Sequence, residues 1–151
     1  MSEKYVPTFT LNDGVEVPAV GLGTWQMQGD EVITAVRSAI DTGYRHIDTA
    51  AFYQNEADIG RAIHDAISAG DVTREELFIT SKVWNDQQSD HEVQAAFRAS
   101  LTNLGLDYLD CYMVHWPCPS TGRHVERFAA LSTLQGLGDV RSIAVANYNG
   151  D

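Results

Sequence analysis

The sequence predicts an α/β protein of the (β/α)8 TIM-barrel class, of which this chain would supply an N-terminal hairpin and strands 1–5. Apolar strand-like segments alternate with amphipathic helix-like segments at intervals of about thirty residues, which is typical of βαβ units and a parallel sheet. A polar or large aromatic residue follows each predicted parallel strand. A barrel gathers its strand ends on the face that carries its chemistry, so this second pattern also favours a barrel.

The first predicted element is a β-hairpin over residues 8–18. Asp13-Gly14 lies there between two segments with a strand-like pattern, and Asp-Gly favours a tight turn. Five parallel strands are expected after the hairpin, each a short apolar segment, at residues 19–23, 45–48, 77–83, 110–115 and 141–146.

Four helices are expected between these strands, because apolar residues recur at helical spacing and glycines mark the ends. The first would have Asp30 as its N-cap and would end at Gly43. The next two stripes run over residues 59–67 and 93–104, and they end at Gly70 and Gly105. The fourth and weakest covers residues 125–135 through Phe128, Leu131 and Leu134.

An open doubly wound sheet would show the same alternation of strands and helices. That fold usually carries a G-x-G-x-x-G motif between its first strand and first helix. The run Gly21-Leu22-Gly23-Thr24-Trp25-Gln26 lacks the third glycine, and no helix is predicted to begin there. The barrel is therefore favoured, and since a barrel takes roughly 250 residues, residues 1–151 are expected to be a single barrel domain that is incomplete at its C-terminus.

Composition excludes several classes of function. A net charge of −11 argues against nucleic acid as a partner, because phosphate binding needs clustered lysine and arginine. The apolar runs are far too short to cross a membrane, and the N-terminus lacks the apolar region of a secretory signal. The two cysteines form no disulfide framework and no metal-ligand spacing, so a cytoplasmic protein is expected.

The residues at the strand ends suggest acid–base chemistry. Asp48 and Lys82 end neighbouring strands and are expected to pair, because an unpaired buried ammonium is unfavourable. Tyr53 lies within loop reach of both, and a nearby cation stabilises a phenolate and so makes a tyrosine a better acid. His115 ends the next strand, where it could hydrogen-bond a substrate oxygen. These residue types predict a site that delivers a proton to a developing alkoxide.

The run Gly43-Tyr44-Arg45-His46-Ile47-Asp48-Thr49-Ala50, followed by Tyr53, Asn55-Glu56 and Gly60, resembles the signature of the aldo-keto reductases. Residues 78–84, 112–117 and 20–25 are similar to three further blocks of that family. The resemblance covers essentially the whole chain in order. The short loop after Pro117 resembles that of small bacterial enzymes related to didehydrogluconate reductases.

The resemblance implies NADPH-dependent reduction of an aldehyde, ketone or keto-sugar to an alcohol. Tyr53 would be the proton donor, assisted by Lys82 and Asp48, and His115 would orient the carbonyl. The cofactor NADPH (NADP) would lie along Gly23, Thr24, Trp25 and Asp48, with Asn147 holding its carboxamide. The substrate pocket would be formed by Trp25, Trp84, His115 and Trp116. The expected partner is a small-molecule carbonyl compound, with no metal, no nucleic acid and no membrane.

Two departures from the family pattern leave alternatives open. Ala146 stands where the family commonly has a serine on the carboxamide, which would remove one hydrogen bond of about 0.5–1.5 kcal/mol. The family's basic segment for the 2′-phosphate would lie beyond strand five. The parent protein is expected to be a monomer. The alternative function is a catalytically inactive part-barrel that persists by self-association or by pairing with a complementary fragment. For Trp84, simple packing at the barrel rim also remains an alternative.

Overall fold

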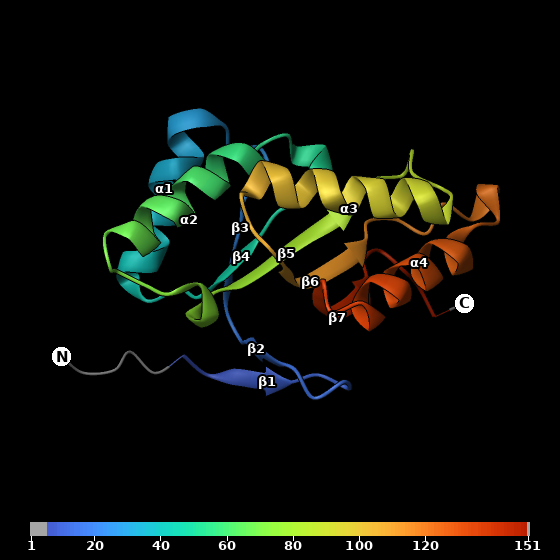
Figure 1. Cartoon of the computed structure of the whole chain (residues 1–151), viewed down its shortest axis with the longest axis horizontal. Helices are drawn as coiled ribbons and strands as arrows, with labels where there is room; N and C mark the ends of the chain where they lie inside the picture. Colours follow the sequence, from blue (N-terminus) through green and yellow to red (C-terminus); the bar gives the residue numbers. More distant parts are fainter. Residues whose placement is uncertain (1–5, 151) are drawn as a thin grey trace.

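The computed structural model describes residues 6–150 and contains a five-stranded parallel sheet (Figure 1). Its strands are β3 (Gly21–Gly23), β4 (His46–Asp48), β5 (Phe78–Val83), β6 (Leu109–Val114) and β7 (Val140–Val145). They lie side by side in chain order, so every connection leads to the adjacent position. A doubly wound sheet would instead reverse direction at a switch point. The strand order is therefore that of a barrel, and the predicted strand ends are correct to within two residues.

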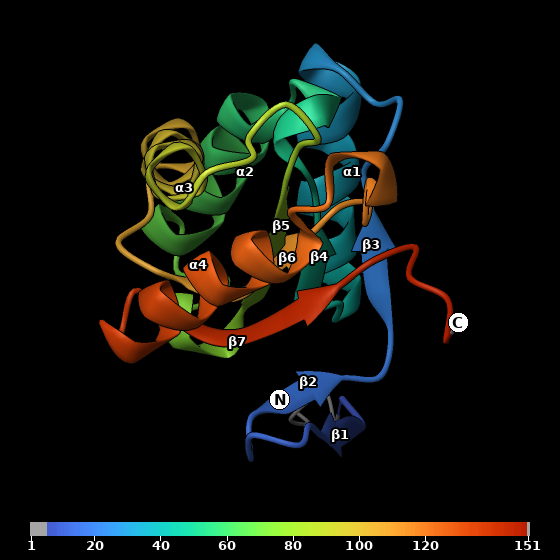
Figure 2. The ribbon, with the colours of Figure 1, turned by 90° about the vertical axis from the view of Figure 1, so that its right-hand side faces the viewer.

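Four α-helices follow one another in an arc around the outside of the strands (Figure 2). Each helix packs against the next along the chain. The core between helices and sheet is apolar, with Phe97 edge-on to Tyr112 at 5.0 Å between ring centroids. The helices are α1 (Gly29–Thr42), α2 (Glu56–Ser68), α3 (Asp90–Leu104) and α4 (His124–Gly136).

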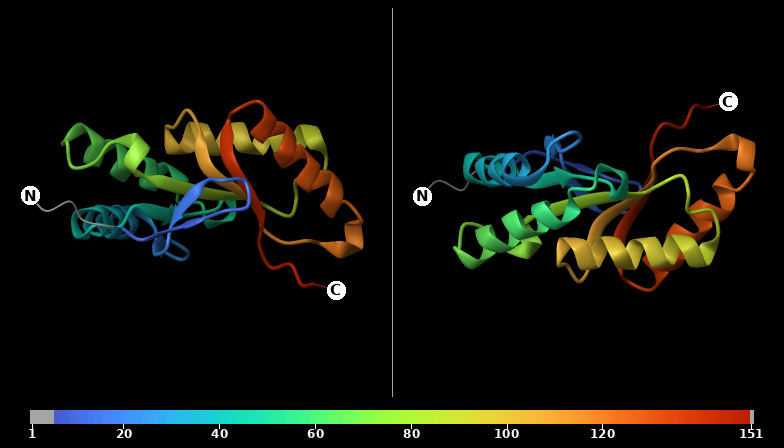
Figure 3. Two further views of the ribbon diagram at one scale, coloured as in Figure 1. Left: turned by 90° about the horizontal axis from the view of Figure 1, so that it is seen from below. Right: turned by 90° about the horizontal axis from the view of Figure 1, so that it is seen from above.

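The predicted hairpin is present as β1 (Thr8–Thr10) and β2 (Glu16–Pro18), which pair antiparallel. Gly14 takes a positive φ of 84° in the turn, which glycine adopts without strain. The hairpin lies across one end of the strands, in front in the view from below and behind in the view from above (Figure 3). The Asp13 carboxylate accepts hydrogen bonds from Ser142 at 2.7 Å and Gln135 at 3.2 Å. The hairpin therefore closes the end opposite the predicted site.

The predicted N-cap of the first helix is wrong. α1 begins at Gly29, so Asp30 lies inside its first turn and makes no side-chain cap. The carboxylate of Asp58, on α2, accepts a hydrogen bond from the Gly29 N–H at 3.1 Å. A residue of a neighbouring helix thus accepts the hydrogen bond that a local N-cap residue was expected to accept.

The predicted apolar face of the fourth helix is also partly wrong. Phe128 is 36% exposed and Val125 is 70% exposed. The buried face of α4 instead begins with a charged residue, Arg127. The other buried residues follow at helical spacing: Ala130, Leu131 and Leu134.

No helix within residues 6–150 is long and apolar enough to cross a membrane.

The close packing of α2 against α3 yields a stability prediction. A Cβ on Gly60 would lie 2.4 Å from the Leu104 carbonyl oxygen, a backbone atom that cannot move aside alone. Gly60→Ala is expected to lower the free energy of unfolding by about 1–3 kcal/mol in urea titrations. Gly136→Ala is the matched control, because nothing lies within 4 Å of its Cβ. Equal stability of the two variants would contradict this packing.

Candidate active site

The register of three neighbouring strands brings the predicted polar residues to one end of the sheet. Asp48 ends β4 and lies opposite Thr80 of β5. Lys82 is two residues further along β5, so its side chain points to the same face as that of Thr80. His115 directly follows β6, and its N–H donates to the Val83 carbonyl at 3.2 Å. The three side chains therefore emerge at the carboxyl ends of their strands.

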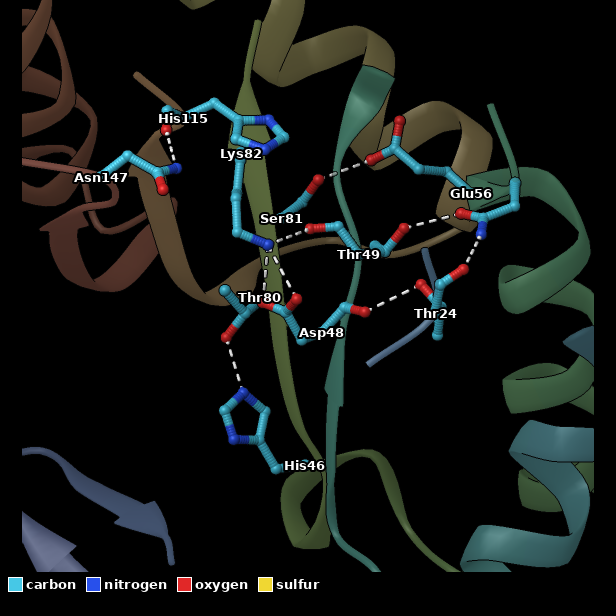
Figure 4. A network of polar contacts seen from close by, with 11 residues as sticks. Thr24, His46, Asp48, Thr49, Glu56, Thr80, Ser81, Lys82, His115 and Asn147 are labelled. Atoms are coloured by element: carbon cyan, nitrogen blue, oxygen red, sulfur yellow. Dashed lines mark hydrogen bonds and ion pairs between the residues drawn. The ribbon is translucent and has the colours of Figure 1, made fainter. Parts of the chain in front are cut away.

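Lys82 and Asp48 form the ion pair that the sequence predicts (Figure 4). The Lys82 ammonium donates to both carboxylate oxygens of Asp48 at 2.8 Å. It also donates to the Thr49 carbonyl at 3.0 Å. Lys82 is only 7% exposed, and these contacts occupy its donors. The ammonium is therefore held in place as a cation.

Tyr53 ends a short 3-10 helix, η1 (Ala51–Tyr53), which sequence reasoning treated only as a loop. The Lys82 ammonium lies 5.3 Å from the centroid of the Tyr53 ring. The rings of Tyr53 and His115 are edge-on, with 5.7 Å between centroids. Gln28 donates to the Tyr53 carbonyl at 2.7 Å, which ties η1 to the loop after β3. The structure thus brings Asp48, Tyr53, Lys82 and His115 together.

His115 is neutral at ordinary pH. The pKa of its imidazole is lowered to about 4, chiefly by burial and secondly by the nearby Lys82 cation, against a smaller opposing effect of Asp48. Its Nδ1 is buried and has no hydrogen-bond partner within residues 6–150. A neutral imidazole donates from only one of its nitrogens. It can therefore orient a substrate oxygen without adding a second positive charge.

A buried network, which sequence reasoning missed, holds the ion pair from behind (Figure 4). The Thr49 hydroxyl donates to the Asn55 side-chain oxygen at 2.8 Å. Asn55 donates to the carbonyls of Thr24 and Met27 at 2.8 and 3.1 Å. The Thr24 hydroxyl donates to the Asp48 carbonyl at 2.8 Å. These bonds join the loops after β3 and β4. The only signal for Asn55 in the sequence was its place in the Asn55-Glu56 pair.

Glu56 is a buried carboxylate on the outer side of β5. It accepts hydrogen bonds from Ser81 at 2.8 Å and Ser100 at 3.2 Å. Burial raises the pKa of Glu56, and these hydroxyls oppose the rise. Glu56 therefore links α2 to β5 and α3 behind the site.

His46 is a partly buried histidine whose ring is held within the sheet. Its Nε2 hydrogen-bonds the Thr80 hydroxyl at 2.9 Å, and burial lowers its pKa.

Aromatic side chains surround His115. Trp84 stacks on Phe52 at 3.8 Å and lies edge-on to His115 at 5.1 Å between ring centroids. A hollow of about 440 Å³ is lined by Phe52, Trp84 and residues of α3. Trp116 and Trp25 are 44% and 61% exposed. Trp84 therefore packs on Phe52 and also contacts His115, and its part in a substrate pocket stays a prediction.

The residues expected along a cofactor differ in what they offer. Gly23 is exposed, and a Cβ there would meet nothing within 4 Å. Asn147 is exposed and donates to the His115 carbonyl at 2.9 Å, which leaves its amide oxygen available. Thr24 is fully buried and its hydroxyl is already engaged, so its contact with a cofactor stays a prediction. No cluster of metal-ligating side chains occurs within residues 6–150.

This arrangement can protonate a developing oxyanion. A phenol lies beside a fixed ammonium that stabilises the phenolate left after proton transfer. The neutral imidazole lies beside the same phenol and can hold the oxygen that receives the proton.

Known proteins resemble this chain in sequence and in fold. The sequence profile of the Aldo/keto reductase family matches residues 19–151. An aldo-keto reductase of Mycolicibacterium smegmatis is 46% identical over 142 residues, which cover 94% of this chain and 50% of that protein. Methylglyoxal reductase DkgA of Escherichia coli is 47% identical over 139 residues, which cover 91% and 48%. The crystal structure of a Bombyx mori aldo-keto reductase in complex with NADP matches with a TM-score of 0.89 and 44% identity, covering 95% and 51%.

The chain spans about half the length of the curated relatives it matches. Its parallel sheet and outer helices match about half of the Bombyx mori structure, so the fold is part of a (β/α)8 barrel. Since the family profile covers nearly all of the sequence, the chain belongs to the aldo/keto reductase family.

Proposed function

We propose that this chain carries the proton-delivery site of an NADPH-dependent carbonyl reductase. The observation that carries the proposal is the buried Lys82 ammonium, fixed by Asp48 and placed beside the ring of Tyr53. A fixed cation at a phenol serves proton donation to an oxyanion. The reaction converts an aldehyde, ketone or keto-sugar, NADPH and a proton into an alcohol and NADP.

The hydride belongs to NADPH, because no side chain of this chain can supply one. The names of two relatives support this choice, since one was crystallised with NADP and another is a methylglyoxal reductase. On this chain, the open surface at Gly23 and the free amide oxygen of Asn147 fit a nicotinamide cofactor. Trp25 and Asp48 would extend that surface, and a contact of the cofactor with the buried Thr24 stays a prediction.

Asp48, Tyr53, Lys82 and His115, together called the tetrad, divide the proton transfer among them. Tyr53 donates its hydroxyl proton to the carbonyl oxygen as the alkoxide develops. Lys82 stabilises the phenolate that remains, and Asp48 holds the ammonium in place. His115 donates a hydrogen bond to the same oxygen and so fixes its direction. Trp25, Trp84 and Trp116 form the walls that position the substrate.

A second candidate function is a catalytically inactive part-barrel that persists by self-association or by pairing with a complementary fragment. Within residues 6–150, β3 and β7 each have one edge without a partner strand. An apolar hollow of about 520 Å³ lies beside β7, lined by His124, Val125, Phe128, Ala144, Val145 and Tyr148. Unpaired edges and apolar surface favour association.

Size-exclusion chromatography and NADPH titration of this chain separate the two candidates. The second candidate predicts a dimer or larger species that does not bind NADPH. A monodisperse monomer that binds NADPH with roughly micromolar affinity would rule that candidate out.

Tyr53→Phe tests the role of the proton donor. Loss of the hydroxyl is expected to slow NADPH oxidation with carbonyl compounds by about 10²–10⁴-fold, the usual contribution of a general acid. Tyr108→Phe is the matched control, because its ring lies under Arg74, away from the tetrad. A Tyr53→Phe rate equal to that of the parent would refute the mechanism.

The protonation state of His115 gives a pH prediction. With a pKa of about 4 against an ordinary value of 6.5, the imidazole is expected to stay neutral from pH 8 to about 5. As the pH falls below 6.5, His115 of the unfolded chain becomes protonated while His115 of the folded chain stays neutral. The free energy of unfolding is therefore expected to be unaffected by His115 above pH 6.5 and to decrease as the pH falls from 6.5 toward 4. NMR titration measures the midpoint, and His115→Asn identifies the signal. A midpoint at 6.5 or above would contradict the neutral role.

A further inference from the structure

A fully buried arginine lies outside the tetrad, on the inward face of α4. Arg127 is 0% exposed. It forms no ion pair with any residue in the range 6–150. Burying a cation without a carboxylate partner is unfavourable, so its remaining contacts must compensate.

The contacts of Arg127 are two backbone carbonyls on neighbouring loops. One terminal nitrogen, Nη1, donates to the Trp116 carbonyl at 2.9 Å. The other, Nη2, donates to the Trp84 carbonyl at 3.0 Å. Trp84 directly follows β5, and Trp116 lies two residues beyond β6. The planar guanidinium thus joins two adjacent strand ends at a spacing set by its own width.

His115 belongs to the loop after β6 and contacts the loop after β5. The Trp84 ring lies edge-on to the imidazole at 5.1 Å, and Trp116 is the next residue in the chain. α4 packs against both β6 and β7, and Figure 2 shows it beside them on the outside of the sheet. Arg127 therefore reaches the loops from behind and leaves the substrate side free.

We propose that Arg127 is a positioning residue that sets the spacing between the backbones of Trp84 and Trp116 next to His115, and so shapes the carbonyl-binding pocket. The inference rests on the proposed function for the meaning of the pocket. The geometry itself is independent of turnover. Arg127 touches neither substrate nor cofactor and acts only through the two loops.

Tryptophan fluorescence tests the geometry without activity. The chain has three tryptophans, so a Trp25→Phe background leaves only Trp84 and Trp116. In that background, Arg127→Met is expected to raise acrylamide quenching about twofold as the loops loosen. Arg61→Met is the matched control, since Arg61 is 72% exposed on α2 and should leave quenching unchanged. Parental quenching in a folded Arg127→Met chain would overturn the inference.

Two measurements keep the test decisive if Arg127→Met does not fold. Arg127→Lys retains the charge but loses the planar fork, so it is expected to show intermediate quenching. In the parent chain, nitrogen-15 NMR should give separate, slowly exchanging signals for the Nη1 and Nη2 protons of Arg127. A freely rotating guanidinium, or parental quenching in Arg127→Lys, would overturn the inference.

Kinetics separate positioning from general stability. Arg127→Lys is expected to raise KM for the carbonyl compound roughly fivefold, while kcat and KM for NADPH stay within about twofold. A change of similar size in kcat, in KM for the carbonyl compound and in KM for NADPH would indicate a merely structural role and overturn the inference. An inactive chain that still shows the fluorescence change supports the inference while counting against the proposed function.

Discussion

The burial of the Lys82 ammonium is the constraint on which the rest of the site depends. A cation that is 7% exposed is stable only where oxygen atoms meet all its donors, and here Asp48 and Thr49 provide them. Both partners lie at the end of β4, so the register between β4 and β5 must place that end beside Lys82. Thr49 is then fixed by Asn55, which also binds the loop after β3. The ends of β3, β4 and β5 are thus connected, directly or through Asn55, to the Lys82 ammonium.

The sequence predicts three of the four members of the tetrad because they stand at strand ends, where a polar residue interrupts an apolar run, and it predicts Tyr53 because that residue lies within loop reach of Asp48. Asp48, Lys82 and His115 are visible in this way, and the sequential strand order follows from the repeated strand–helix unit. Asn55 is not visible, because two of its three partners are backbone carbonyls 28 and 31 residues away. Any residue type can offer such a carbonyl, so only the folded chain reveals the partner.

The errors on α1 and α4 have a common physical origin. Predictions from apolar periodicity and capping preferences assume that a helix caps its terminal N–H groups and forms its buried face with its own residues and their nearest neighbours in the chain. On α1, the Gly29 N–H donates to the carboxylate of Asp58, which belongs to another helix and takes the place of a local cap. On α4, Arg127 occupies the inward stripe, while Phe128 turns outward at 36% exposure. A charge on an apolar stripe is therefore an indication of a specific buried acceptor rather than of a weak helix.

The two buried cations, Lys82 and Arg127, are stabilised by different means because they do different things. The charge of Lys82 is part of the proposed chemistry, and a carboxylate of opposite charge lies directly against it. Arg127 stays protonated without such help, since a guanidinium does not lose its proton in proteins. Two carbonyls accept hydrogen bonds from its terminal nitrogens while its Nε has no partner within residues 6–150, and the directions of these two bonds convert the planar shape of Arg127 into a fixed distance between loops. Charge is the property that matters for Lys82, whereas shape is the property that matters for Arg127.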